Sequence, residues 1–141
     1  MASEDITKAV IEFAKTHRLG RSSEYKKLHS DICNAPKKER YFGLMGVFKY
    51  DLREQRTLVQ TFAGRMLLKM TPKAMESCEK AIFSLLPYWD VSAEEVIFYL
   101  KDQFGRQKVL LVVTTLKSGS LPERDIALLN TIEYWLSGNE L

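Results

Sequence analysis

Apolar residues recur at intervals of three and four along most of this chain, which is the spacing of one face of an α-helix. One run contains Ile6, Val10 and Phe13, and a later one contains Ile126 and Leu129. Only four prolines and seven glycines interrupt the 141 residues, whereas an all-β domain of this length needs more turn residues. The sequence therefore predicts an all-α fold.

Capping and stop signals divide this pattern into about seven to eight helices joined by short loops. Helix starts are expected at Ser3, Ser22 or Ser23, Lys37, Asp51, Thr71 with Pro72, Ser92 and Ser120. Helix ends are expected at Gly20, Asn34, Tyr50, Met70, Leu86, Gly105 and Gly138. Such a series predicts one domain spanning 1–141, built as a compact bundle or a short stack of helical hairpins.

The most specific local signature is the sequence from Val91 to Val96. Ser92 and Glu95 have the spacing of a capping box, and Val91 and Val96 occupy the two positions of a hydrophobic staple. This combination predicts that a helix begins at Ser92.

Two glycines interrupt the third predicted helix. Gly43 and Gly46 each weaken an isolated helix by about 1 kcal/mol relative to alanine. Because a residue without a side chain also permits close contact, their spacing suggests that a neighbouring helix approaches there.

The segment Val109–Leu116 is rich in β-branched residues and reads locally as a buried strand. A lone strand has no pairing partner in a helical chain. We therefore expect a helix that is buried on all sides. The alternative is an α+β fold with a strand at about 108–116.

Several positions are expected in the core. These are Phe13, Leu28, Phe62, Ile82, Leu100, Leu110 and Ile132, together with the two cysteines, Cys33 and Cys78, as reduced thiols. The polar, acidic start of the chain does not resemble a secretory signal, and no apolar run approaches the ~20 residues that span a membrane. These features predict a cytoplasmic protein with no membrane partner.

Residues that carry catalysis are sparse. His29 and Cys33 are four residues apart and can meet on one helix face, but no third group is evident to orient the pair. No His or Cys spacing suits a metal ion, and no glycine-rich phosphate loop is present. We therefore expect no enzyme activity, catalytic residue, metal or cofactor.

Charge is distributed unevenly along the chain. Residues 1–70 carry 14 Lys and Arg against 8 Asp and Glu, whereas residues 71–141 carry 7 against 10. Basic residues with interleaved aromatics, here Tyr25 and Tyr41, can follow a nucleic-acid backbone and stack on bases. The candidate nucleic-acid-binding residues are Lys26, Lys27, Lys37, Lys38 and Arg40.

The predicted helix 93–104 carries a competing candidate site. A helical wheel separates Val96, Leu100 and Phe104 from a side where Phe98 lies among acids. An aromatic anchor surrounded by charges is typical of protein recognition. The predicted partner-binding residues are Trp89, Asp90, Glu94, Glu95, Phe98 and Asp102. The alternative is that Phe98 belongs to the core.

The run Leu86–Ser92, followed by Glu95, Tyr99, Leu100, Phe104 and Gly105, resembles part of a known family, and Tyr134–Leu136 adds to the match. It is similar to the small helical immunity proteins of bacterial contact-dependent growth inhibition systems, over about a third of the chain. The resemblance implies an antitoxin-like, non-enzymatic inhibitor that binds a cognate toxin domain, in many systems a nuclease. The alternatives are a nucleic-acid-binding regulatory protein and a helical adaptor.

Overall fold

All regular secondary structure is helical in the computed structural model, which describes residues 1–16 and 23–137. The helices are α1 (Ser3–Thr16), α2 (Ser23–Cys33), α3 (Lys37–Gly46), the 3₁₀ helix η1 (Val47–Lys49), α4 (Arg56–Met70), α5 (Cys78–Leu85), α6 (Glu95–Phe104), α7 (Arg106–Lys117) and α8 (Glu123–Ser137). The all-α prediction is confirmed. The alternative strand at 108–116 is wrong, because that segment lies within α7.

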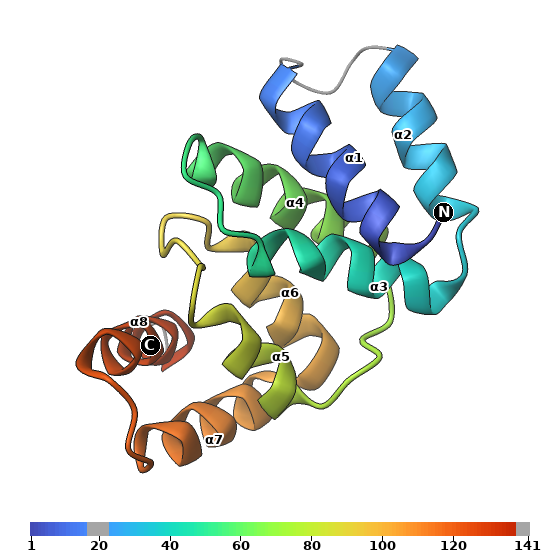
Figure 1. Cartoon of the computed structure of the whole chain (residues 1–141). Helices are drawn as coiled ribbons and strands as arrows, with labels where there is room; N and C mark the ends of the chain where they lie inside the picture. The colour runs from blue at the N-terminus through green and yellow to red at the C-terminus, as the bar shows by residue number, and fades with distance from the viewer. Residues whose placement is uncertain (17–22, 138–141) are drawn as a thin grey trace.

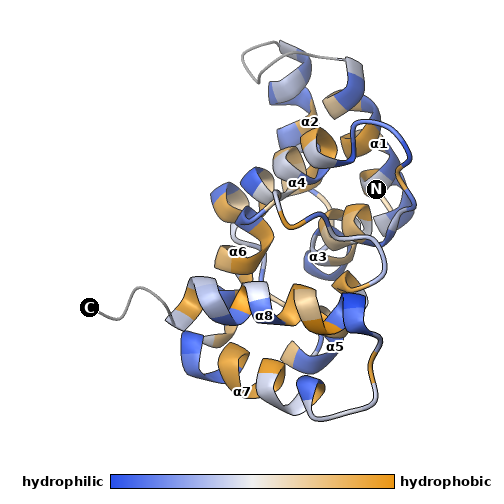
Figure 2. Ribbon diagram, turned by 90° about the vertical axis from the view of Figure 1, so that its left-hand side faces the viewer, coloured by the Kyte–Doolittle hydropathy of each residue, from blue (hydrophilic) through white to orange (hydrophobic). Residues whose placement is uncertain are grey.

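The helices form a short stack. Helices α1 to α4 lie at one end and α7 and α8 at the other, with α6 between them (Figure 1). Helix α1 packs on α3 and α4, α4 packs on α6, and α7 contacts α5, α6 and α8. Most of these helices carry both polar and apolar residues (Figure 2), as amphipathic helices with one buried side do. Within the described residues, no helix has the length and hydropathy needed to cross a membrane.

Glycines lie where the helices cross most closely. A Cβ atom at Gly43 would fall 2.5 Å from Ile6 Cβ, and one at Gly46 would fall 2.4 Å from Thr7 Oγ1. The Thr7 hydroxyl donates a hydrogen bond to the Gly43 carbonyl at 2.6 Å, which joins α1 to the backbone of α3. The expectation that these glycines permit a close helix approach is confirmed.

One continuous core runs through the whole stack. Its bulkiest members include Trp89, Tyr41, Tyr99 and Phe48. Among the predicted core positions, the buried ones are Phe13, Leu28, Ile82, Leu100, Ile132 and Cys78. Phe62 and Leu110 are only partly buried and pack against the outside of this core.

The connection between α4 and α5, residues 71–77, is irregular but tied to the core. The buried Tyr41 donates its hydroxyl hydrogen to Glu76 Oε2 at 2.7 Å, and Tyr99 donates to the Pro72 carbonyl. Gln103 accepts the Ala74 N–H at 2.8 Å. Burial, together with the neighbouring Glu76 carboxylate, raises the pKa of Tyr41, so this phenol stays protonated as a donor.

Four predicted helix starts are wrong, and one of them is that of α8, which begins at Glu123 instead of Ser120. Helix α4 begins at Arg56 instead of Asp51, and α5 begins at Cys78 instead of Thr71, which is the left-handed C-cap of α4 with φ 46°. Helix α6 begins at Glu95, and the Ser92 side chain does not cap it. Instead, the Ser92 N–H donates to Asp90 Oδ1 at 2.8 Å, so this residue belongs to a turn before the helix.

Two burial predictions also need correction. Helix α7 is amphipathic and not buried on all sides, because Leu111 is 60% exposed. Cys33 is exposed because it ends α2 just before the turn at Pro36. The predicted helix ends at Gly20 and Gly138 lie outside the described residues.

We predict that Gly43→Ala destabilises the protein by about 2 kcal/mol, because the added methyl overlaps Ile6. This loss outweighs the helix-propensity gain of about 1 kcal/mol that alanine brings. Gly119→Ala is the matched control, because its Cβ would meet only the Leu116 carbonyl oxygen at 3.4 Å. Thermal unfolding followed by circular dichroism measures both; equal stabilities for the two variants would contradict the assigned crossing.

We predict that Ser77→Ala costs about 1 kcal/mol, because its hydroxyl oxygen accepts the Lys80 N–H at 3.1 Å and caps α5. Ser92→Ala should cost much less, since its side chain caps no helix. Urea unfolding of the two variants provides the measurement. A larger loss for Ser92→Ala than for Ser77→Ala would favour the boundary that the sequence suggested.

Candidate functional site

Three of the predicted partner-binding residues share one side of α6. Glu94, Phe98 and Asp102 follow one another at four-residue spacing, which places them on one helical face. Glu94 and Asp102 are exposed, and within the described part of the chain neither forms an ion pair. Both carboxylates are therefore accessible from solvent.

Phe98 is partly buried, between the two alternatives that the sequence left open. Its ring stacks on Trp135 of α8 with centroids 6.4 Å apart and planes inclined by 24°. Trp135 is itself partly buried and meets the edge of Trp89 at 5.9 Å. Lys101 Nζ lies 5.8 Å from the centre of the Phe98 ring. We call Glu94, Phe98, Asp102 and Trp135 the aromatic–acidic face.

Trp89 belongs to the core and not to this face. It is 2% exposed, and its Nε1–H donates to the Ala93 carbonyl at 3.0 Å. Prediction of Trp89 as a surface contact was wrong, because an aromatic in a loop between helices is buried here by packing from α8.

Asp90 organises the turn before α6. Its Oδ2 accepts the Thr57 hydroxyl at 2.6 Å and its Oδ1 accepts the Ser92 N–H at 2.8 Å. The hydrogen bond from Thr57 is the main reason that the pKa of Asp90 lies below its usual range. The backbone N–H of Asp90 also donates to the buried Gln60 at 2.8 Å. Asp90 therefore serves the fold instead of the surface.

Glu95 points toward α4. Its Oε2 lies 3.7 Å from Arg65 Nε, and its backbone and Cβ approach Gly64 so closely that a Cβ there would lie 2.8 Å away. The other carboxylate oxygen, Oε1, is buried and has no hydrogen-bond partner among residues 1–16 and 23–137. Glu95 thus lies at the α4–α6 crossing and is separate from the aromatic–acidic face.

The basic residues are divided between two helices. Lys26 and Lys27 are exposed on α2, where Lys27 pairs with Asp31 at 3.1 Å, and Lys37 and Lys38 are exposed on α3. Arg40 is partly buried and donates its Nε–H to the Ala35 carbonyl at 3.0 Å.

The aromatics interleaved with these cations are not presented for base stacking. Tyr41 is fully buried. Tyr25 is partly buried and packs against Phe13 and Phe62, with centroids 5.9 and 6.2 Å away. This arrangement weakens the nucleic-acid hypothesis, because stacking needs an accessible ring face.

The two cysteines differ sharply. Cys33 Sγ lies 3.7 Å from His29 Nδ1 on the surface of α2, so the predicted proximity is real. Within residues 1–16 and 23–137, no carboxylate forms a hydrogen bond or ion pair with His29 that would orient it. Burial raises the pKa of the Cys78 thiol to about 11, which keeps it protonated.

Outside 17–22 and 138–141, no three His, Cys, Asp or Glu side chains cluster as metal ligands do.

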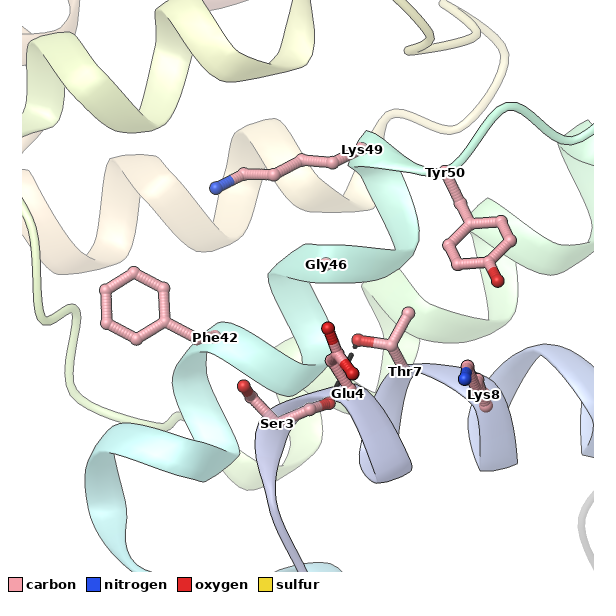
Figure 3. Close-up of a pocket in the computed structure, with 8 residues that line it drawn as sticks. All are labelled: Ser3, Glu4, Thr7, Lys8, Phe42, Gly46, Lys49 and Tyr50. Atoms are coloured by element: carbon pink, nitrogen blue, oxygen red, sulfur yellow. Dashed lines mark hydrogen bonds between the residues drawn. The ribbon is translucent and has the colours of Figure 1, made fainter.

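A pocket of about 470 Å³ opens between the start of α1 and the α3–η1 segment (Figure 3). Phe42 and Tyr50 stand on opposite sides of it, with Glu4 and Thr7 between them. Lys8 and Lys49 add positive charge. The Thr7 hydroxyl donates its hydrogen to the Gly43 carbonyl, an arrangement that serves helix packing and does not activate Thr7 as a nucleophile.

Two features escaped the sequence analysis. Trp135 became part of the candidate site only because α8 packs beside α6, a contact that no local pattern encodes. Lys73 lines a pocket together with Lys37 and Arg40. The sequence did not predict this pocket, because the expected helix start at Thr71 placed Lys73 in a helical turn.

No protein-family model matches the sequence, and no curated protein or solved structure is significantly similar to it.

We predict that Asp90→Asn lowers stability by about 1 kcal/mol at neutral pH, because the hydrogen bonds to a charged acceptor are weakened in a partly exposed turn. The folded-state pKa lies below the unfolded value. The stabilisation is therefore full above the unfolded pKa and is lost as pH falls through the folded one.

Urea unfolding of the wild type and Asp90→Asn across this acidic range should show the two stabilities converging. Asp102→Asn is the matched control, since Asp102 is exposed and unpaired among the described residues. A difference between wild type and Asp90→Asn that stays constant down to the lowest pH would contradict the assigned role.

Proposed function

We propose that this chain is a non-enzymatic protein-binding domain, an inhibitor of the immunity type, that binds a basic toxin domain through the aromatic–acidic face. The observation that carries the proposal is the stacked Phe98–Trp135 pair, partly exposed on the same face as the carboxylates of Glu94 and Asp102, which form no ion pair with any described residue. The residues that resemble immunity proteins lie on both sides of Glu94, Phe98 and Asp102 in the sequence, and the only one of them on this face is Trp135.

The aromatic pair has the properties of a binding anchor. Large aromatic side chains dominate the energetics of many protein interfaces. Trp135 is supported from beneath by the buried Trp89, and Phe98 is supported by Trp135. Because these rings are already ordered, binding would cost little side-chain entropy.

The surrounding charges favour a basic partner. Glu94 and Asp102 flank the rings, and residues 71–141 carry three more acids than bases. Opposite potentials accelerate encounter between proteins. Lys101 over the Phe98 ring is the kind of cation–π contact that an arginine of the partner would also make. Nuclease toxins, which bind phosphates through basic grooves, meet this requirement.

We predict that Glu94→Lys combined with Asp102→Lys slows association with the toxin domain, with a penalty that shrinks as salt rises. The partner to test is the C-terminal domain of any large exoprotein that a gene neighbouring this one is found to encode. Glu12→Lys is the control, because Glu12 is an exposed acid on α1 at the other end of the stack. Surface plasmon resonance separates the association and dissociation rates.

The aromatic anchor is tested with Phe98→Ala, which should raise the dissociation rate and cost about 2 kcal/mol or more of binding free energy. Circular dichroism must first show that the variant is folded, since Phe98 also packs on α8. Inhibition of nuclease activity by the wild type, and its loss in the variant, are the expected results. Binding that is equally strong for the wild type and for all these variants would place the interface elsewhere, and binding to several unrelated proteins would favour an adaptor.

A further inference from the structure

A second pocket, of about 220 Å³, lies where the start of α3 meets the α4–α5 connection. Its lining residues are Lys37, Arg40, Met70, Thr71, Pro72 and Lys73. Three of these six side chains are cationic and come from two separate segments. The pocket is distinct from the aromatic–acidic face, with which it shares no residue.

The cations that line this pocket are not paired with a carboxylate among the described residues. None of Lys37, Arg40 and Lys73 forms an ion pair within residues 1–16 and 23–137. Two acids lie close in the sequence, Glu39 and Glu76, and each accepts a hydrogen bond from a neutral group, the Ser3 N–H at 3.2 Å and the Tyr41 hydroxyl, without pairing with these cations among the described residues. Three cations that line one small pocket without a paired carboxylate repel one another, and a bound anion offsets that repulsion.

The backbone adds to the positive potential. Lys37 and Lys38 open α3, and no side chain caps the free N–H groups of its first turn. Cations at this end of a helix oppose its dipole, so the arrangement lowers the stability of the isolated helix. The same N–H groups and the dipole favour an anion. The two lysines therefore destabilise the start of α3 at a place where the backbone favours a negatively charged ligand.

The walls of the pocket are fixed before any ligand binds. The Arg40 guanidinium is oriented by its Nε–H bond to the Ala35 carbonyl. The opposite wall, the α4–α5 connection, is held by three hydrogen bonds from the core. They join Tyr99 to Pro72, Gln103 to Ala74 and Tyr41 to Glu76. These contacts bracket Lys73, so its backbone position is set by the core of the protein.

We propose that this pocket binds a phosphate group, carried by a small molecule or free in solution. Its volume is below the ~300–1,000 Å³ of pockets that enclose drug-sized ligands, which favours a phosphate over a whole nucleotide. Arginine and lysine recognise phosphate through charge-assisted hydrogen bonds. Within residues 1–16 and 23–137, Arg40 forms side-chain hydrogen bonds through Nε alone, so its two terminal nitrogens remain for this contact.

The proposal is tested by isothermal titration of the whole chain with inorganic phosphate at constant ionic strength maintained by chloride. Lys37→Gln and Lys73→Gln should each weaken binding roughly tenfold, the loss expected for one charge-assisted hydrogen bond. Lys38→Gln is the matched control, since Lys38 carries the same charge one residue away without lining the pocket. All three lysines are exposed, so the variants should remain folded.

A parallel titration with a single-stranded oligonucleotide distinguishes a dedicated pocket from a general basic surface. Saturable phosphate binding that depends on Lys37 and Lys73 but not on Lys38 supports the proposal. No phosphate binding by the wild type, or an equal loss in all three variants, overturns it. Oligonucleotide binding that all three lysines affect equally, without phosphate binding, would instead support the nucleic-acid hypothesis.

Discussion

The contact between α1 and α3 sets the geometry of the first half of the molecule. Helix axes approach closely only where side chains are small, and Gly43 and Gly46 lie at that point against Ile6 and Thr7. The Thr7 hydroxyl then bonds directly to the backbone of α3. Gly64 has the same role where α4 meets Glu95 of α6. Two helix crossings with glycine at the contact, α1 on α3 and α4 on α6, therefore set how the helices pack from the N-terminal end of the stack to α6.

The two irregular connections depend on this framework. Residues 71–77 are held by Tyr41, Tyr99 and Gln103, and Asp90 is held by Thr57 and the buried Gln60. Each of these side chains comes from a helix that the glycine crossings place. Both candidate sites adjoin such a connection: the cationic pocket includes part of 71–77, and the aromatic–acidic face begins just after Asp90. Rigid loops on a helical scaffold are suited to presenting a binding surface.

Local sequence signals predicted the helices well, because amphipathic spacing reflects burial that every helix must achieve. They failed where a distant residue decides the outcome. Ser92 and Glu95 form a plausible capping box, but Asp90 takes the Ser92 N–H and Arg65 attracts Glu95. Thr71 and Pro72 read as a helix start, but Pro72 accepts a bond from Tyr99 and the helix begins at Cys78.

The candidate site was only partly predictable for the same reason. The spacing of Glu94, Phe98 and Asp102 is local and follows from the helical period. Burial of Trp89 and the support of Phe98 by Trp135 depend on how α8 packs, and the sequence carries no short-range sign of that contact. The cationic pocket joins Lys37 to Lys73, which are far apart in the chain and meet only in the folded structure.

The position of the tryptophans has a consequence for spectroscopy. Trp89 and Trp135 are the only two in the chain, and they lie in edge contact at the α8 end of the stack. Tryptophan fluorescence, excited at wavelengths where the six tyrosines do not absorb, therefore reports on the surroundings of this pair, whereas far-UV circular dichroism reports on every helix. Comparison of the two signals during unfolding therefore shows whether the two ends of the stack unfold together or one after the other.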